Sequence, residues 1–276
     1  ADKSHNIEII QFLSQYRKAT EKELENNFPN FYDLNLLFQH KLLGFATHRN
    51  KTKLLVNGEQ KFPELLNTLQ AAKHHIHIEY YIYENDQIGN EIADILIKKA
   101  KEGVEVRFIY DDFGSRSIRK TIVPRLCENG VKAVPFFKIA LVNFANRINY
   151  RNHRKIVIVD GEFCFIGGIN ISDKYDNRRK NKHYWRDTHL KIQGEVAWAL
   201  QSIFIADWNF CSKENLKPNT NYFKLHSIDE NLNWVQLVSS GPDSERPYIL
   251  FSYLQAIHNA YKCVFIVSLK GYTPLV

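Results

Sequence analysis

The sequence has no methionine and only four cysteines in 276 residues. The cysteines are scattered, and none belongs to a Cys-x-x-Cys pair, so we interpret them as reduced, buried thiols and expect no metal or other cofactor. No apolar run approaches the roughly 18 residues that a membrane-spanning helix needs. We also expect no secretory signal peptide in this sequence.

The chain begins at Ala1 without an initiating methionine. We therefore expect a fragment or processed form that is soluble by itself. Any membrane anchor of the full-length protein would lie outside it, and we expect that full-length protein to be membrane-associated.

Acidic residues are outnumbered: 37 Lys and Arg face 30 Asp and Glu, which gives a net charge of +7 and a pI near 9.1. This balance favours an anionic partner, which could be nucleic acid, an acidic membrane surface or a phosphate ester.

Strand patterns alternate with helix patterns through most of the chain. Residues 1–45 read as helical, with Pro29 interrupting the run. From Lys53 we expect a short strand ending in an Asn57-Gly58 turn, then a helix with Pro63 near its start. Strands are predicted at 75–83, 104–112 and 131–137, with helices at 89–103 and 117–130. This order is typical of an α/β domain with a parallel or mixed sheet flanked by helices.

A hairpin is predicted next, with strands 153–160 and 162–170 joined by a turn at Asp160-Gly161. After a basic loop come a strand at 188–194 and a helix at 195–210. The loop contains Arg178, Arg179, Lys180, Lys182 and His183 and is interpreted as solvated surface.

Beyond residue 233 the opening pattern recurs. Strand, turn, helix and strand follow in the same order, and Leu-Gln-Ala stands in both helices. We therefore predict an N-terminal helical segment (1–52), a complete domain (53–211), a linker (212–233) and the start of a second, similar domain (234–276). The similarity is loose enough that chance likeness between α/β segments is the alternative.

His153 and Lys155 are two apart on a predicted strand, so they project to one face while Arg154 points away. A neutral imidazole can attack phosphorus or carry a proton, and an ammonium binds phosphate oxygens. Gly168 would let a substrate approach closely, and the Asn170 amide could donate to the same phosphate. These residues predict a phosphodiester site that works without metal.

Asp160 and Asp187 are the carboxylates that could assist His153. Asp160 has the opposite parity on the strand and begins the turn, so we expect it to be a scaffold residue, although we keep it among the catalytic candidates. Asp187 is the better candidate to orient the imidazole. Singly, each feature has an ordinary structural explanation; together and in order they indicate function. The candidates are His153, Lys155, Asp160 and Asp187 for catalysis and Lys155, Gly168 and Asn170 for phosphate binding.

The motif His-x-Lys-x4-Asp-x6-Gly-Gly-x-Asn is met by His153, Lys155, Asp160, Gly167, Gly168 and Asn170. It resembles the signature of the phospholipase D superfamily. From about Lys53 to Trp208 the surroundings resemble the bacterial cardiolipin synthases within that superfamily, as in "HIHIEYYIYENDQIG" and "YWRDTHLKIQG".

The resemblance implies a phospholipase D-like fold in which two fused domains bring paired motifs to one cleft. It implies phosphatidyl transfer through a phosphohistidine, with two phosphatidylglycerol molecules giving cardiolipin and glycerol at a membrane surface. His153 would be the nucleophile or the general acid. Because this chain carries one such motif, we expect it to be inactive or nearly so alone, unless it forms a homodimer or meets a second half-domain.

Two other functions stay open. One is a homodimeric single-motif phosphodiesterase or nuclease, although the aromatic residues lie in strand-like runs and are better explained as core than as base-stacking groups. The other is a domain that binds acidic lipid without catalysis.

Overall fold

The computed structural model describes residues 46–136, 152–179, 183–224, 232–240 and 246–265, with positions 14, 17, 18, 20–26, 32 and 44 before them. Most of the predicted N-terminal helical segment lies outside these residues, although 20–26 are helical. Lys180 and Lys182 of the basic loop and residues 266–276 also lie outside them.

Within the described residues, the strands form one mixed sheet of eight in the order β4-β3-β2-β5-β6-β7-β1-β8. Neighbours β2, β3 and β4 are parallel, and every other neighbouring pair is antiparallel. The bounds are β1 Ala46–Val56, β2 His75–Tyr80, β3 Glu105–Asp111, β4 Lys132–Phe136, β5 Lys155–Val159, β6 Phe163–Gly167, β7 Thr188–Gly194 and β8 Asn233–Gln236.

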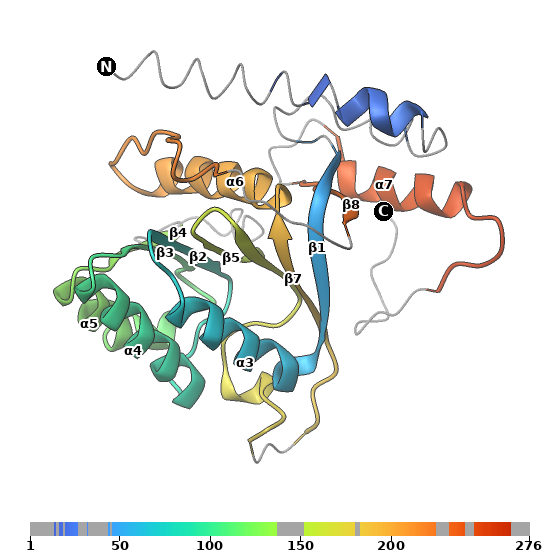
Figure 1. Cartoon of the computed structure of the whole chain (residues 1–276). Coiled ribbons are helices and arrows are strands. Elements are labelled where there is room, and N and C mark those ends of the chain that lie inside the picture. The colour runs from blue at the N-terminus through green and yellow to red at the C-terminus, as the bar shows by residue number, and fades with distance from the viewer. Residues whose placement is uncertain are drawn as a thin grey trace.

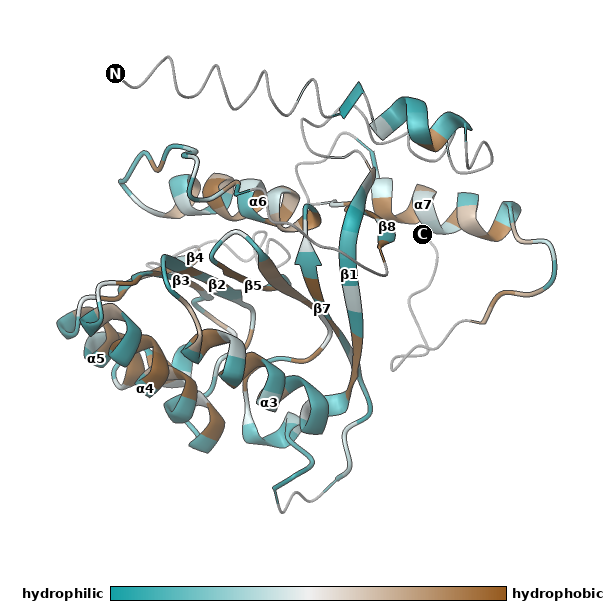
Figure 2. Cartoon of the chain, viewed as in Figure 1, coloured by the Kyte–Doolittle hydropathy of each residue, from teal (hydrophilic) through white to brown (hydrophobic). Residues whose placement is uncertain are grey.

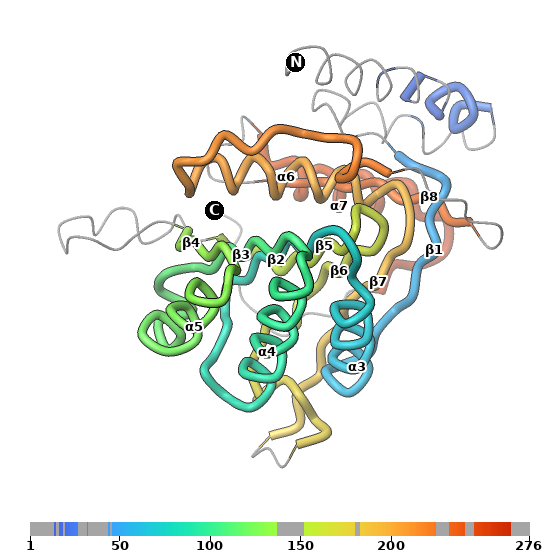
Figure 3. The backbone as a smooth tube through the Cα atoms, turned by 60° about the vertical axis from the view of Figure 1, so that its left-hand side comes forward, coloured from blue at the N-terminus to red at the C-terminus, as the bar shows by residue number. Residues whose placement is uncertain are grey.

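Helices cover both faces of this sheet. On one face lie α3 (Asn57–Gln70), α4 (Gln87–Lys101) and α5 (Ile122–Glu128); α6 (Val196–Cys211) lies on the other (Figures 1 and 3). The helix α7 (Tyr248–His258) follows β8, and short 3-10 turns form at Arg116–Ile118 and Asp173–Tyr175. The predicted α/β class, with a mixed sheet flanked by helices, is confirmed.

Successive hydrophobic side chains along a strand point to opposite faces of the sheet, so one strand contributes to the hydrophobic core on each face. On β5, Val157 and Val159 pack toward α3, α4 and α5, whereas Ile156 and Ile158 pack toward α6. Hydrophobic residues accordingly line the sheet and the helix sides that face it (Figure 2). Each fully buried side chain of this size stabilises the fold by about 1.5–3 kcal/mol.

The predicted start of the first strand and its Asn-Gly turn are wrong. β1 begins at Ala46, because antiparallel pairing with both β7 and β8 extends it through the polar residues before Lys53. Asn57 and Gly58 open α3 directly, and Pro63 lies inside that helix. Asn57 has the left-handed φ of 57°, and its backbone N–H donates to the Asp187 carbonyl at 2.9 Å. Asn tolerates this conformation, so strand passes to helix without an intervening loop.

The predicted hairpin between β5 and β6 is confirmed. Asp160 and Gly161 both have positive φ, at 56° and 66°, and the Glu162 N–H donates to the Val159 carbonyl at 3.1 Å. Two left-handed residues define a type I′ turn, whose twist matches that of the flanking strands. The expectation of buried cysteines holds for Cys164 but is wrong for Cys127 and Cys263, whose side chains are exposed.

The segment after α6 lies against the domain. Residues 212–224 form no helix or strand, yet Tyr222 and Phe223 are buried against Trp198 and Ile205 of α6. β8 then joins the sheet beside β1, and α7 buries none of its residues. The division into domains stays a prediction. No helix in the described ranges combines the length and apolarity needed to cross a membrane.

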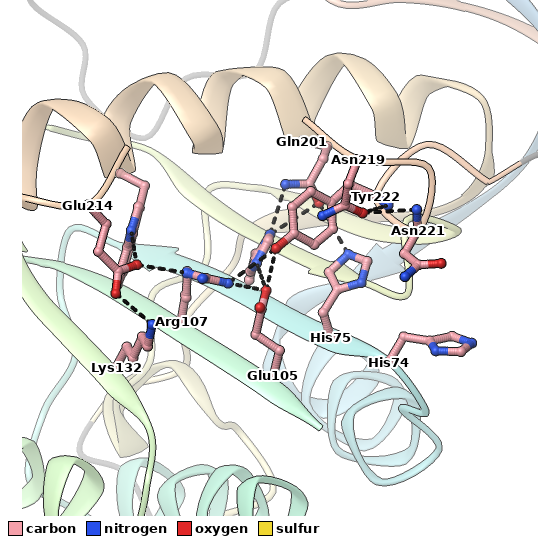
Figure 4. A network of polar contacts seen from close by, with 12 residues as sticks. His74, His75, Glu105, Arg107, Lys132, Gln201, Glu214, Asn219, Asn221 and Tyr222 are labelled. Atoms are coloured by element: carbon pink, nitrogen blue, oxygen red, sulfur yellow. Dashed lines mark hydrogen bonds and ion pairs between the residues drawn. The ribbon is translucent and has the colours of Figure 1, made fainter. Parts of the chain in front are cut away.

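A polar network lies between β2, β3, α6 and the 212–224 segment (Figure 4). His77 and Tyr222 both contact the Glu105 carboxylate, and His75 contacts the Gln201 amide at 3.2 Å. Arg107 pairs with Glu105, and Figure 4 shows it between that residue and Glu214. Burial, assisted by the neighbouring His77, lowers the pKa of His75 to about 3.

Acid is therefore expected to destabilise the protein through His75. Between pH 6.5 and about 3, His75 binds a proton in the unfolded chain but not in the folded protein. The free energy of unfolding therefore rises with pH across this window. At about 1.4 kcal/mol per unit, the loss from pH 6.5 to 4 is roughly 3 kcal/mol. Urea unfolding of His75→Gln across this range should show a shallower acid loss. The matched control, His74→Gln on the exposed neighbour, should keep the full slope, and equal slopes in both variants would contradict the assignment.

Candidate active site

The strand register places the last residues of β1, β2 and β6 beside the first residues of β5 and β7. These five strands therefore meet at one end of the sheet. Tyr80 of β2 pairs with Lys155 of β5, and Gly167 of β6 pairs with His189 of β7. His189 pairs in turn with Leu55, next to the end of β1. The loops and strand ends that carry the predicted motif therefore converge here.

The Tyr81 ring contacts both His153 and Lys155. It stacks on the imidazole with ring centroids 4.0 Å apart and an interplanar angle of 19°. The Lys155 Nζ lies 5.3 Å from the Tyr81 ring centroid and donates to the His153 carbonyl at 2.6 Å. The two residues expected to act together are thus held by the same aromatic ring. Cation–π contact and stacking both favour this arrangement.

The ammonium of Lys155 is half-buried, and the nearby negative charge of Asp187 offsets only part of the cost of burying it. Burial lowers its pKa to about 8, and the negative charge of Asp187 opposes that shift. Lys155 is therefore mostly charged at neutral pH, with little solvent around it. A weakly solvated cation of this kind binds a phosphate oxygen more strongly than an exposed lysine does.

Asp187 lies against Gly168. A Cβ added to Gly168 would come within 2.2 Å of Asp187 Oδ1, so the absence of a side chain makes room for this carboxylate. Asp187 accepts from the Thr188 N–H at 2.7 Å and lies 3.4 Å from the Trp185 indole nitrogen. The structure thus brings Asp187, Lys155 and Gly168 together. The orientation of His153 by Asp187, and the approach of substrate at Gly168, stay predictions.

Asn170 is buried beside this cluster. Its Oδ1 accepts from the Ile82 N–H at 3.2 Å, and its Nδ2 donates to the Tyr175 hydroxyl at 3.1 Å. These contacts fix the loop after β6 to the end of β2. Phosphate binding by Asn170 stays a prediction, since each of its amide atoms already bonds within the protein.

Asp160 lies at the opposite end of β5 from Lys155, away from the other candidates. Its carboxylate accepts from the backbone N–H groups of Lys73, His74 and His75 at 2.9, 2.7 and 3.0 Å. These bonds tie the hairpin turn to the start of β2. Strand parity and the length of β5 separate Asp160 from His153, so these contacts fit the expected scaffold role, whereas a catalytic role for Asp160 stays a prediction.

Three buried polar side chains beneath the site were not singled out from the sequence. The Lys61 ammonium, the Tyr80 hydroxyl and both His189 nitrogens have no hydrogen-bond partner among the described residues. Burial lowers the pKa of Lys61 and of His189, which keeps the latter neutral. His189 was accessible to sequence reasoning, because it lies two residues beyond Asp187 on a strand. Lys61 and Tyr81 gave no such signal.

No group of three or more His, Cys, Asp or Glu side chains with the arrangement of a metal site occurs in the described ranges. The side chains gathered at the sheet edge offer an imidazole, a cation and a carboxylate. This combination can perform nucleophilic or acid–base chemistry on an anionic ester.

Comparison with known proteins places residues 65–208 in a family described as "Cardiolipin synthase, PLD-like domain". The chain is 44% identical over 231 residues to cardiolipin synthase 1 of Bacillus anthracis, covering 82% of this chain and 45% of that protein. It is 42% identical over 257 residues to a cardiolipin synthase of Oceanobacillus iheyensis, covering 91% and 53% respectively.

The chain therefore spans about half the length of the curated relatives it matches. Among solved structures, NucT from Helicobacter pylori aligns with a TM-score of 0.47 and 19% identity, covering 59% of this chain and 98% of that one.

Proposed function

Because this chain belongs to the cardiolipin synthase family of phospholipase D-like domains, we propose that it provides the His153 half of a phosphatidyl-transfer site. The reaction is the joining of two phosphatidylglycerol molecules into cardiolipin with release of glycerol. The observation that carries this proposal is the clustering of His153 and Lys155 around Tyr81. The family membership and the names of the relatives support the choice of substrate.

In the proposed reaction, an imidazole nitrogen of His153 attacks the phosphorus of the first phosphatidylglycerol. A nitrogen–phosphorus bond forms, the bond to the glycerol oxygen breaks, and a general acid protonates the leaving alkoxide. The glycerol hydroxyl of a second phosphatidylglycerol then attacks the phosphohistidine and loses its proton to that same group. Cardiolipin leaves, and His153 is regenerated. His153 could take the general-acid role instead, with the attacking histidine supplied by the second motif.

The other residues have supporting roles in this proposal. Lys155 binds the non-bridging phosphate oxygens, where negative charge grows in the transition state. Asp187 holds the His153 ring in one tautomer and stabilises the imidazolium. The second histidine comes from a second copy of this chain or from a second half-domain. The net charge of +7 would draw the protein to an anionic membrane surface.

Vesicles of phosphatidylglycerol test the function directly. Incubation with the protein, at a concentration at which two copies pair, should yield cardiolipin and free glycerol in equal amounts. Production of phosphatidic acid and glycerol instead would replace transfer by hydrolysis. Cleavage of single-stranded DNA, with the lipid untouched, would favour the phosphodiesterase alternative.

A further inference from the structure

The backbone on both sides of His153 is held from the α6 face of the sheet. Asn152 Oδ1 accepts from the Arg154 N–H at 3.0 Å, which closes a turn around His153. The Asn152 amide nitrogen donates to Glu79 Oε1, and the Arg154 guanidinium pairs with Asp207 of α6 at 2.5 Å. The neighbours of His153 are therefore fixed by two acidic residues that do not belong to the motif.

Glu79 is an unusual member of β2. Its flanking residues Ile78 and Tyr80 enter the core under α3 and α4, so Glu79 points toward α6, where it is only 1% exposed. Its Oε1 accepts from Asn152, but its Oε2 is buried with no hydrogen-bond donor among the described residues. Burial raises the pKa of Glu79, the Asp207 carboxylate beside it raises it further, and Arg154 and Asn152 oppose the shift.

Asp207 lies within hydrogen-bonding reach of the Glu79 carboxyl group, and two acids in this arrangement can share one proton. We propose that Glu79 and Asp207 share a proton in this way and act together as positioning residues for His153, by fixing Asn152 and Arg154. The inference rests on the proposed function for the role of His153. It adds that the position of His153 is set by two acidic residues on the α6 face of the sheet.

Loss of the shared proton should release His153. The buried carboxylate of Glu79 and the partly buried carboxylate of Asp207 would then face the single guanidinium of Arg154, and their repulsion would loosen both anchors. Other groups packed around Glu79 do not supply a charge: Cys211 of α6 stays a neutral thiol because burial raises its pKa to about 12, and burial lowers the pKa of His77. The β3 partner in register is the apolar Ile109.

The contact between His153 and Tyr81 provides a readout that needs no turnover. A proton lying over an aromatic ring resonates upfield, so the chemical shift of the His153 ring reports whether it remains stacked at 4.0 Å. The His153 signal among the 11 histidines is assigned by its disappearance in His153→Ala. An NMR titration from pH 6 to 10 then follows the stacking directly.

Three substitutions of the acid pair give different expected results. In the unchanged protein the upfield shift should be lost in an alkaline transition. Glu79→Gln keeps an acceptor for Asn152 and a donor for Asp207 but cannot ionise, so the transition should shrink to the part that deprotonation of Lys155, whose pKa is about 8, causes at Tyr81 and His153. Asp207→Asn removes the charge that raises the pKa of Glu79, so the transition should move down by about one pH unit or more. Glu79→Leu should lose the upfield shift at every pH.

Glu105→Gln is the matched control, because Glu105 lies on the neighbouring strand in the separate network of His77 and Tyr222. It should titrate at His153 like the unchanged protein. His153 shifts that are identical in the unchanged protein and all acid-pair variants would overturn the proposal. If circular dichroism shows that Glu79→Leu does not fold, the titrations of Glu79→Gln and Asp207→Asn still test the proposal. If lipid transfer is absent while the titration behaves as expected, the proposed function fails and the positioning role stands.

Discussion

A His153→Ala variant is expected to form cardiolipin from phosphatidylglycerol at least about 10³-fold more slowly than the unchanged chain. The proposed reaction uses this imidazole either to form the bond to phosphorus or to protonate the leaving oxygen, and alanine can do neither. Stability should change little, because His153 is exposed. Thin-layer separation of labelled lipid products measures the loss, with circular dichroism to verify the fold.

The control for this variant is His183→Ala, which removes another exposed histidine. Its rate should equal that of the unchanged chain. Because a second histidine is proposed to come from another copy or half-domain, the assay should be repeated across protein concentrations. Turnover per chain that rises with concentration supports pairing of two copies, and gel filtration follows the assembly. Transfer retained within tenfold in His153→Ala would contradict the assignment, and robust transfer by a strict monomer would contradict the paired site.

Gly58→Ala is expected to destabilise the fold by about 2–4 kcal/mol, the range of a severe buried clash. A Cβ at this position would lie 1.9 Å from the Tyr175 carbonyl oxygen and 2.9 Å from the Asp176 Cα. Both are backbone atoms and cannot rotate away. The gain in helix propensity from glycine to alanine offsets only about 1 kcal/mol. Urea unfolding should show a lower midpoint with an unchanged slope.

Gly103→Ala separates the clash from the general effect of adding a methyl group. Gly103 has a φ of +89°, and no atom lies within 4 Å of the place that an added Cβ would take, so only backbone strain of roughly 1–2 kcal/mol applies. The loss in Gly58→Ala should exceed that in Gly103→Ala. A Gly58→Ala protein as stable as the unchanged one would mean that the loop at Tyr175 moves freely off α3.

The part of the fold that could be predicted is the part in which local pattern and tertiary environment agree. Alternating Val and Ile in β5 pack against helices on both faces, and the Asp160-Gly161 pair suits a type I′ turn. The polar first half of β1 could not be recognised, because its strand conformation depends on pairing with β7 and β8. The long-range hydrogen bond from the Asn57 N–H to the Asp187 carbonyl likewise accompanies the start of a helix where the sequence predicted an Asn57-Gly58 turn.

The candidate site shows the same division. Parity on a strand correctly separated Arg154, which pairs with Asp207 under α6, from Lys155, which lies near Tyr81. The contacts of Asp160 with three backbone N–H groups, in contrast, depend on where β2 begins in space. Tyr81 could not be distinguished from a core aromatic residue, since its contact with His153 arises only from the pairing of β2 with β5.

The position of β1 between β7 and β8 has a consequence for how the chain folds during synthesis. The Asp187 N–H bonds the side chain of Asn57, 130 residues earlier, at the junction of β1 with α3. Strands β2 to β6 can pair soon after they are made, whereas β1 has no partner until β7 is complete. Contacts so distant in sequence form slowly because a long loop must close first. We therefore expect β1 and α3 to join only after β7, so that the Asp187 side of the site is completed later than the contact of His153 with Tyr81, which needs only the pairing of β2 with β5.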